Sequence, residues 1–241
     1  MSYQQVPGPT DNPYLATYIN SFIIMDFYRQ LQDELMASGV TLVAVSKIQP
    51  IEKIQRLYDL GHRDFGENYV QELIEKAASL PGDIRWHFIG HLQSNKVKSV
   101  IPVAHLIQGI DSLKLLKEID KQAGKAARKV NCLLQVFIAE EETKFGLDEN
   151  ELAAIMGQQE SFGNVNISGL MGMASFSDDE AKVAREFARL KKLSDQYSSQ
   201  FSGEQAPILS MGMSGDYQLA IHNGSNMVRI GSLLFGARPK Q

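Results

Sequence analysis

The sequence predicts an α/β protein folded as a single (β/α)8 TIM barrel with an extra N-terminal helix. The chain has 241 residues, a size at which α/β barrels occur as one domain. From residue 41 onward, eight short runs of branched apolar residues alternate with helical patterns, and this count favours a closed barrel over an open doubly wound sheet. The G-x-G-x-x-G fingerprint of an open nucleotide-binding sheet is also missing from the sequence.

The N-terminal region predicts a tail followed by a helix. Residues 1–13 contain three prolines and few apolar side chains, so we expect a flexible tail there and one barrel unit, with its N-terminal helix, over residues 14–241. Apolar residues then recur at helical spacing, which predicts an amphipathic helix that ends at Gly39. The residues of this stripe are Leu15, Ile19, Phe22, Ile23, Phe27, Leu31 and Leu35.

The barrel strands are expected in the apolar runs, with crossover helices between them. Continuous apolar strands separated by helices indicate parallel strands that are covered on both faces. The clearest helix covers 179–199, where one apolar stripe faces away from charged positions. The predicted strands are 41–47, 64–68, 85–90, 106–111, 131–139, 167–174, 207–213 and 227–236.

Composition excludes several classes of function. The formal net charge is −4 and no basic block occurs, which argues against a nucleic-acid-binding protein. No apolar run approaches transmembrane length, and no zinc-protease, P-loop or serine-hydrolase motif occurs. The single cysteine, Cys132, lies in an apolar run, so we expect a core side chain, no intrachain disulfide and a cytoplasmic protein.

Lys47 is a candidate reactive amine. It ends the first predicted strand, and in a barrel the C-terminal ends of the strands carry the functional groups. Partial burial there would lower the pKa of the amine and make it a nucleophile toward aldehydes. The alternative is a strand-end lysine whose amine reaches solvent.

Two loops rich in small residues predict a phosphate site. The loop after the seventh predicted strand contains Ser214, and the eighth predicted strand contains Gly231 and Ser232. Barrels often hold phosphate at these two loops, through backbone N–H groups, hydroxyls and a helix that we expect to begin near Gly215. Ordinary turn chemistry is the alternative.

Arg229 and Asn68 are further polar candidates. Arg229 lies inside the eighth predicted strand, where a permanent charge needs an acceptor. That acceptor is either a carboxylate, such as Glu67 or Asp111, or a ring nitrogen of a cofactor. Asn68 ends the second predicted strand and either faces the barrel mouth or caps the next helix. His87, which we predict to be a packed strand residue, lacks the companions of a metal site.

Five segments together resemble the pyridoxal phosphate homeostasis proteins, a family similar to the barrel domain of bacterial alanine racemase. They are AVSK, FGENYVQE, WHFIGHLQSNK, LSMGMSGDYQLAI and GSNMVRIGSLLFGAR, in the family's order. The resemblance implies that Lys47 forms a Schiff base with pyridoxal 5′-phosphate. It also implies that Ser214, Gly231 and Ser232 bind the phosphate, that Arg229 faces the pyridine nitrogen and that Asn68 lies near the ring.

The sequence departs from the family pattern at three positions. Ile48 stands where threonine is frequent, Asn226 replaces a threonine before the last strand, and Ser232 stands where threonine is usual. Serine keeps the hydroxyl, so phosphate binding is little affected by the last change. The other two bear on the finer contacts around the cofactor.

The resemblance implies a cofactor carrier rather than an enzyme. An arginine at the ring nitrogen disfavours pyridinium formation and weakens the electron sink that amino-acid chemistry needs. We therefore expect a monomer that limits free pyridoxal phosphate and supplies apoenzymes. One alternative is a small racemase-like enzyme with Tyr69 or His87 as second base. Another is a cofactor-free aldolase that uses Lys47.

Overall fold

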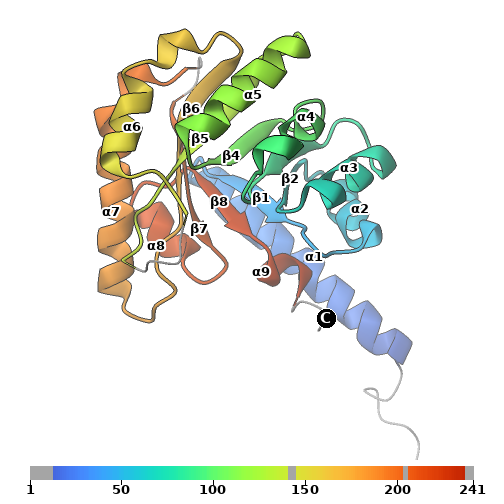
Figure 1. The fold of residues 1–241 in the computed structure, drawn as a ribbon. Helices are drawn as coiled ribbons and strands as arrows, with labels where there is room; N and C mark the ends of the chain where they lie inside the picture. The colour runs from blue at the N-terminus through green and yellow to red at the C-terminus, as the bar shows by residue number, and fades with distance from the viewer. Residues whose placement is uncertain (1–12, 141–144, 203–205, 237–241) are drawn as a thin grey trace, which may run out of the picture.

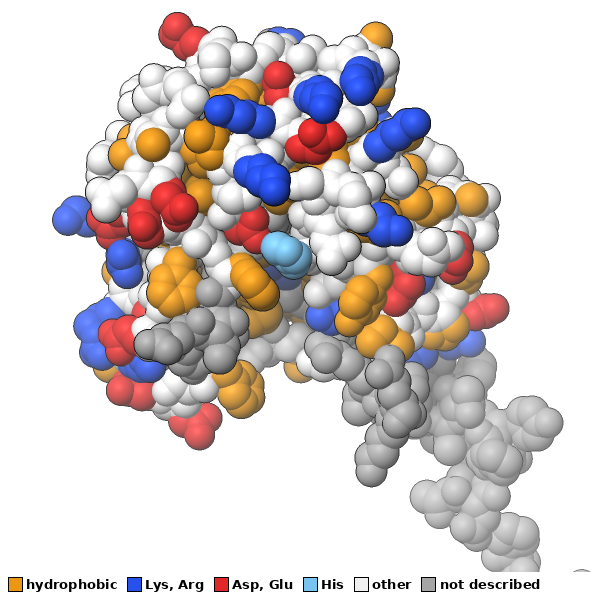
Figure 2. Space-filling model, viewed as in Figure 1, with side chains coloured by type: hydrophobic (Ala, Val, Ile, Leu, Met, Phe, Trp, Pro, Cys, Tyr) orange, Lys and Arg blue, Asp and Glu red, His pale blue; other side chains and the backbone are white. Residues whose placement is uncertain are grey.

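The computed structural model describes residues 13–140, 145–202 and 206–236, with side chains from residue 25 onward. The predicted tail, residues 1–13, therefore lies outside the described residues except for Pro13, which begins helix α1. No helix in the described ranges has the length and apolarity to cross a bilayer. Acidic and basic side chains are intermingled on the face shown in Figure 2.

The eight predicted strands form one closed parallel barrel in chain order, as predicted. The barrel closes where β1 pairs with β8, with Thr41 opposite Met227 and Ala44 opposite Ile230. The strands are β1 (Thr41–Val45), β2 (Asp64–Glu67), β3 (Arg85–Phe88), β4 (Leu106–Ile110), β5 (Val130–Val136), β6 (Val165–Gly172), β7 (Ile208–Met213) and β8 (Met227–Ile230).

Helices surround the barrel, and α1 runs past it at the N-terminal end of the chain (Figure 1). They are α1 (Pro13–Ala37), α2 (Ile51–Asp59), α3 (Val70–Ser79), α4 (Val97–Val100), α5 (Leu113–Lys125), α6 (Glu149–Met156), α7 (Glu180–Gln196), α8 (Tyr217–His222) and α9 (Ser232–Phe235). Short 3-10 turns lie at Ser94–Lys96, Gln159–Ser161 and Ser198–Gln200.

Several strand ends differ from the predicted ones. Strand β1 ends at Val45, so Lys47 lies in the following turn and is not the last strand residue. Strand β8 ends at Ile230, and the predicted strand residues from Ser232 onward begin α9 instead. The apolar run continues through this change because one face of α9 is also buried, at Leu234 and Phe235. An apolar run alone does not distinguish a buried strand from a buried helix.

The core has two parts. A small cluster comes from strands on different sides of the barrel, namely Val43, Leu106, Leu133, Met171 and Met227, and therefore fills its interior. A larger cluster lies between the barrel and the helices and contains Cys132, as predicted. It also contains the predicted α7 stripe of Val183, Phe187, Leu190, Leu193 and Tyr197.

The N-terminal helix packs on the barrel as predicted. Helix α1 lies against β1 and α9, and its Tyr28, Leu31 and Leu35 are buried. The helix ends at Ala37, and Gly39 follows with a φ of 66°, a conformation that glycine adopts at little cost. The predicted stripe residues before residue 25 lie outside the described side chains.

Candidate functional site

A cavity of about 610 Å³ opens at the C-terminal ends of the barrel strands. All of the site residues predicted from the sequence line it, although they come from four different segments of the chain. These residues are Lys47, Asn68, Ser214, Arg229, Gly231 and Ser232. Barrel closure thus brings an amine, a guanidinium, hydroxyls and an amide to one opening.

Lys47 lies in a tight turn between β1 and α2 and is half-buried. The next residue, Ile48, has a φ of 63°, which is a strained conformation for a β-branched side chain. The Ile48 N–H donates to Glu72 Oε2 at 2.7 Å, and this bond holds the turn in place. Pro50 then precedes α2 in an extended conformation, so the turn that carries Lys47 is constrained on both sides.

Lys76 ties this turn to β2. Its ammonium donates to the Ser46 carbonyl at 2.8 Å, to Glu67 Oε1 at 2.8 Å and to Glu72 Oε2 at 2.7 Å. Burial raises the pKa of Glu67 against the opposing effect of Lys76. The pKa of Glu72 is lowered, because bonds from Lys76 and the Ile48 N–H outweigh desolvation. This network was not predicted, and its signal in the sequence is the i,i+4 spacing of Glu72 and Lys76.

The two predicted phosphate loops meet at Ser214. Its hydroxyl accepts a hydrogen bond from the Gly231 N–H at 3.3 Å. A Cβ atom at Gly231 would approach the Val45 carbonyl to 3.3 Å, so glycine allows the loop to lie close to β1. Ser232 begins α9, and the first N–H groups of a helix lack intrahelical partners. Helix α8 begins at Tyr217, two residues after Gly215, which agrees with the helix expected near that position.

Arg229 is buried in β8, with 3% of its surface exposed. It donates to Ser210 Oγ at 2.6 Å and to the Gly172 carbonyl at 2.9 Å. The carboxylate partners considered from the sequence are wrong, because Glu67 binds Lys76 and Asp111 binds His91. Burial lowers the pKa of Arg229 to about 10, while Asp216 opposes the shift. The guanidinium therefore stays charged at neutral pH and faces the cavity.

Asn68 does not cap helix α3, which was the alternative role considered from the sequence. Helix α3 is preceded by Tyr69, which makes no side-chain cap bond, whereas Asn68 lines the cavity. His87 is a packed strand residue, as predicted, with 1% exposure. It lines a different cavity of about 830 Å³, at the N-terminal ends of the strands. Neither Tyr69 nor His87 lines the cavity that contains Lys47.

Comparison with known proteins assigns the family. Residues 24–239 match the alanine racemase N-terminal domain. The pyridoxal phosphate homeostasis protein of Pasteurella multocida is 38% identical over 204 residues, covering 83% of this chain and 88% of that protein. The protein of the same name from Schizosaccharomyces pombe is 37% identical, covering 88% of this chain and 90% of that protein. The chain belongs to the pyridoxal phosphate homeostasis protein family.

Two solved structures are similar to this chain over most of its length. PipY of Synechococcus elongatus, solved with PLP bound, superposes with a TM-score of 0.80 at 36% identity, covering 88% of this chain and all of PipY. Alanine racemase from Bartonella henselae superposes with a TM-score of 0.70 at 18% identity, covering 90% of this chain and 63% of that protein. The second likeness concerns the fold alone.

One of the departures from the family pattern lies far from the mouth. Asn226 accepts from the Leu209 N–H at 2.7 Å and donates to the Pro207 carbonyl at 2.8 Å. It lines the cavity at the N-terminal ends of the strands, so it does not alter the Lys47 cavity. Ile48, in contrast, is the strained residue beside Lys47.

The loop after β6 supplies lining residues that sequence analysis missed. Ser175, Phe176, Ser177 and Asp178 all line the Lys47 cavity. Glu186 of α7 anchors this loop, because it accepts both the Ser175 N–H and the Ser175 hydroxyl at 2.6 Å. Four consecutive polar or aromatic residues after a predicted strand were the available signal. The side chain of Phe176 is 96% exposed.

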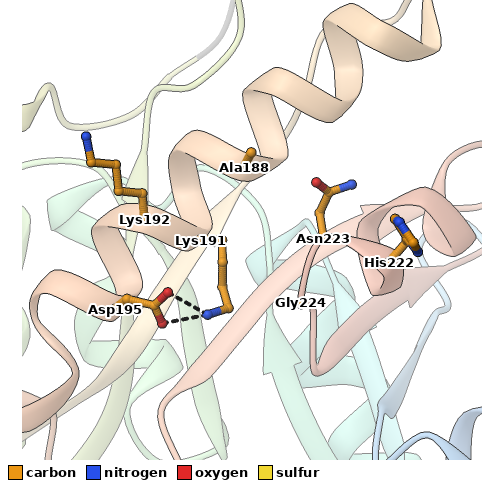
Figure 3. A pocket seen from close by; sticks show the side chains of 7 residues that line it. All are labelled: Ala188, Lys191, Lys192, Asp195, His222, Asn223 and Gly224. Carbon is orange, nitrogen blue, oxygen red and sulfur yellow. Dashed lines mark hydrogen bonds and ion pairs between the residues drawn. The ribbon is translucent and has the colours of Figure 1, made fainter.

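Two other features carry no candidate site. A hollow of about 510 Å³ between α7 and the turn after α8 is lined by Lys191, Lys192 and His222, and Lys191 is paired with Asp195 (Figure 3). Within the described ranges, no group of three or more His, Cys, Asp or Glu side chains could hold a metal ion. The buried thiol of Cys132 has its pKa raised by desolvation, which suits a packed core side chain.

Proposed function

We propose that this chain binds pyridoxal 5′-phosphate in the Lys47 cavity and acts in pyridoxal phosphate homeostasis. The observation that carries the proposal is the convergence of Lys47, Arg229 and Ser214 on one cavity. We also propose that the protein is a cytoplasmic monomer that limits free cofactor and supplies it to apoenzymes. The names of its relatives, which describe homeostasis proteins, support this function.

The cavity fits the chemistry of this cofactor. Its volume of about 610 Å³ lies within the range of about 300–1,000 Å³ that is typical of small-ligand sites. Ser214, Ser232 and the first N–H groups of α9 would hold the phosphate, and Lys47 would reach the opposite end. When bound, pyridoxal phosphate supplies an aldehyde for a lysine amine and an electron-withdrawing ring.

Arg229 supports a carrier rather than an enzyme. A guanidinium can only donate hydrogen bonds, so Arg229 would face an unprotonated ring nitrogen. An unprotonated ring is a weak electron sink, which disfavours chemistry on amino acids. A racemase would also need a second base, and neither Tyr69 nor His87 lines this cavity. A cofactor-free aldolase would leave Arg229 and Ser214 without a role.

The proposal is tested by chemical trapping on the full chain. Protein loaded with pyridoxal phosphate is treated with borohydride and digested, and the masses of its peptides are measured by mass spectrometry. We expect the cofactor mass on the peptide that contains Lys47 and no such adduct in Lys47→Ala. The control is Lys53→Ala, which removes a nearby lysine that bonds to Gln49 and to the Phe235 carbonyl. An adduct that persists in Lys47→Ala would refute the assignment.

The same loaded protein tests the remaining parts of the proposal. Its native mass should correspond to one chain. Mixed with a pyridoxal-phosphate-dependent apoenzyme, it should restore that enzyme's activity while a trap removes free aldehyde. A native mass of two chains would contradict the monomer. Activity that fails to recover would contradict direct supply.

A further inference from the structure

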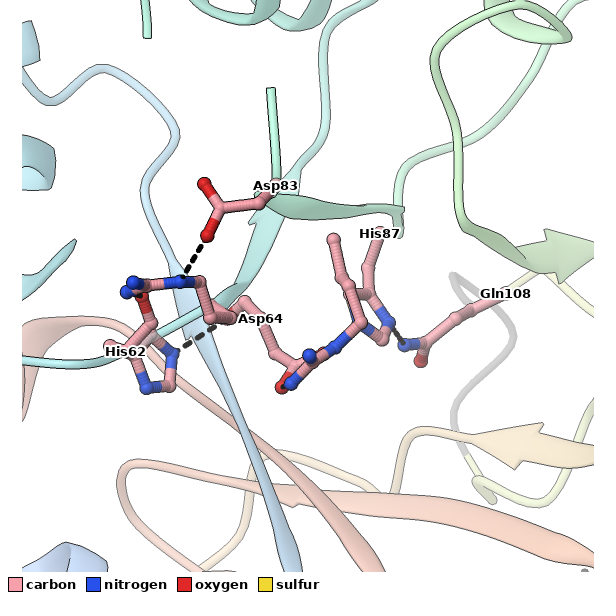
Figure 4. A network of polar contacts seen from close by, with 7 residues as sticks. His62, Asp64, Asp83, His87 and Gln108 are labelled. Atoms are coloured by element: carbon pink, nitrogen blue, oxygen red, sulfur yellow. Dashed lines mark hydrogen bonds and ion pairs between the residues drawn. The ribbon is translucent and has the colours of Figure 1, made fainter. Parts of the chain in front are cut away.

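A chain of hydrogen bonds crosses the barrel interior beneath Arg229. Arg229 donates to Ser210 Oγ at 2.6 Å, and the Ser210 hydroxyl donates to Gln108 Oε1 at 2.7 Å. Gln108 Nε2 lies 3.0 Å from His87 Nδ1, and His87 Nε2 lies 3.0 Å from Asp64 Oδ1. Figure 4 shows His87 and Gln108 facing one another. All five residues are buried, with at most 9% of their surface exposed.

The two ends of this chain fix its direction. A guanidinium can only donate and an ionised carboxylate can only accept. The pKa of Asp64 is strongly lowered, because bonds from His87 and Arg85 outweigh desolvation, so Asp64 is ionised. Every bond can then point from Arg229 toward Asp64. The other hydrogen of Gln108 Nε2 points at the sulfur of Met227, at 3.3 Å, which agrees with this amide orientation.

The direction of these hydrogen bonds also determines the tautomer of His87. Because Gln108 Nε2 is a donor, His87 Nδ1 must be unprotonated, and the single ring proton is on Nε2, where Asp64 accepts it. A second proton on Nδ1 would meet the N–H of Gln108 and force the amide to turn over. Ser210 would then lose its acceptor. The state of His87 is therefore coupled through two side chains to the contact that Arg229 makes with Ser210.

We propose that Ser210, Gln108 and His87 are positioning residues for the cofactor ring. They hold the Arg229 guanidinium so that its remaining N–H groups face the Lys47 cavity, and they thereby keep the ring nitrogen unprotonated. This inference rests on the proposed function. The other charged groups that line the same cavity are Lys47, Asp178 and Asp216, and of these Asp216 acts electrostatically on Arg229.

Two substitutions interrupt the hydrogen-bond chain at different bonds. Ser210→Ala removes the acceptor of Arg229, and Gln108→Met removes the next link at similar volume. The control is Ser225→Ala, because Ser225 is also a buried serine but its hydroxyl bonds to the carbonyls of Leu209, Met211 and Met227. Circular dichroism and thermal melting establish that each variant is folded.

The absorbance of the bound cofactor is then followed against pH. A guanidinium that is no longer held in place lowers the pKa of the ring nitrogen less. We therefore expect the protonation midpoint to rise by about one pH unit in Ser210→Ala and Gln108→Met, and the dissociation constant to rise about fivefold. Ser225→Ala should match the wild type. Unchanged midpoints in both folded variants would overturn the inference.

A measurement on the wild type without cofactor tests the direction of the hydrogen-bond chain separately. Nitrogen-15 NMR of the wild type at neutral pH should show His87 as the neutral Nε2–H tautomer. The Nδ1–H tautomer or an imidazolium would overturn the proposed direction, even if pyridoxal phosphate binds. Failure of the wild type to bind pyridoxal phosphate, with the expected tautomer present, would instead refute the proposed function and with it the role toward the ring.

Discussion

His62 shows how one buried residue makes the fold sensitive to acid. Its ring is 4% exposed and packs edge-on against Tyr28 and Phe65. Nε2 donates to the Asp64 carbonyl at 2.7 Å (Figure 4). Burial lowers the pKa of His62 to about 4, so the folded protein keeps this ring neutral. The unfolded chain takes up a proton near pH 6.5.

We predict that His62 destabilises the protein as the pH falls from 6.5 toward 4. In that window the unfolded state binds more protons than the folded state, so the free energy of unfolding decreases with falling pH. Between pH 7 and pH 5 the loss from this residue should be about 2 kcal/mol. Urea unfolding at the two pH values measures it. His62→Gln should lack this part of the loss.

The matched control for this prediction is His222→Gln, because His222 is exposed. That variant should keep the wild-type dependence on pH. If the free energy of unfolding of His62→Gln depends on pH as steeply as that of the wild type, protonation of His62 in the unfolded chain does not cause the loss, and the prediction is wrong.

At the scale of elements, two helices contain the same kind of ion pair in different surroundings. In α3, Lys76 contacts Glu72 and Glu67, and the Lys76 side chain is 7% exposed. In α7, Lys191 contacts Asp195 at the same i,i+4 spacing, and these side chains are 41% and 62% exposed (Figure 3). Burial, not spacing, decides what each pair contributes.

We predict that Lys76→Met lowers the free energy of unfolding by about 3–5 kcal/mol, because it leaves the buried Glu67 carboxylate and the partly exposed Glu72 carboxylate without their counter-charge. Lys191→Met should cost less than about 1 kcal/mol. Chemical denaturation of both variants at neutral pH compares them directly. A cost of less than 1 kcal/mol for Lys76→Met would show that Glu67 and Glu72 are compensated without Lys76.

The existence and order of the elements could be predicted from the sequence, but their ends could not. The apolar runs specified all eight strands and the α7 stripe, since burial on both faces requires such runs. The predicted first strand runs two residues too far, to Lys47, because no glycine or proline follows the apolar run before Pro50. The positive φ of Ile48 depends on Glu72, which is 24 residues away, and no local pattern reports that contact.

At the scale of the whole molecule, closure of the barrel assembles the site. Lys47 follows β1 and Arg229 lies in β8, which are paired neighbours only because the barrel closes. The sequence placed both residues at one mouth by the general rule for barrels. The partners of Arg229 were not predictable, because Ser210 and Gly172 lie 19 and 57 residues away and carry no charge that marks them as acceptors.

Because residues from the whole barrel line the cavity, cofactor binding should stabilise the entire fold. A ligand that binds only the folded state adds about 2.7 kcal/mol at a free concentration 100 times its dissociation constant. For a chain of this size, that corresponds to a rise in Tm of about 5–10 °C. Thermal melting with increasing pyridoxal phosphate measures it.

One variant and one smaller ligand test the contributions of the two ends of the cavity separately. Lys47→Ala should show a smaller rise, because the phosphate contacts remain and the bond to the aldehyde is lost. Inorganic phosphate should also give only a small rise, since it reaches Ser214 and Ser232 alone. A wild-type Tm that does not change with millimolar pyridoxal phosphate would contradict binding in this cavity. Equal shifts for the wild type and Lys47→Ala would assign the affinity to the phosphate end.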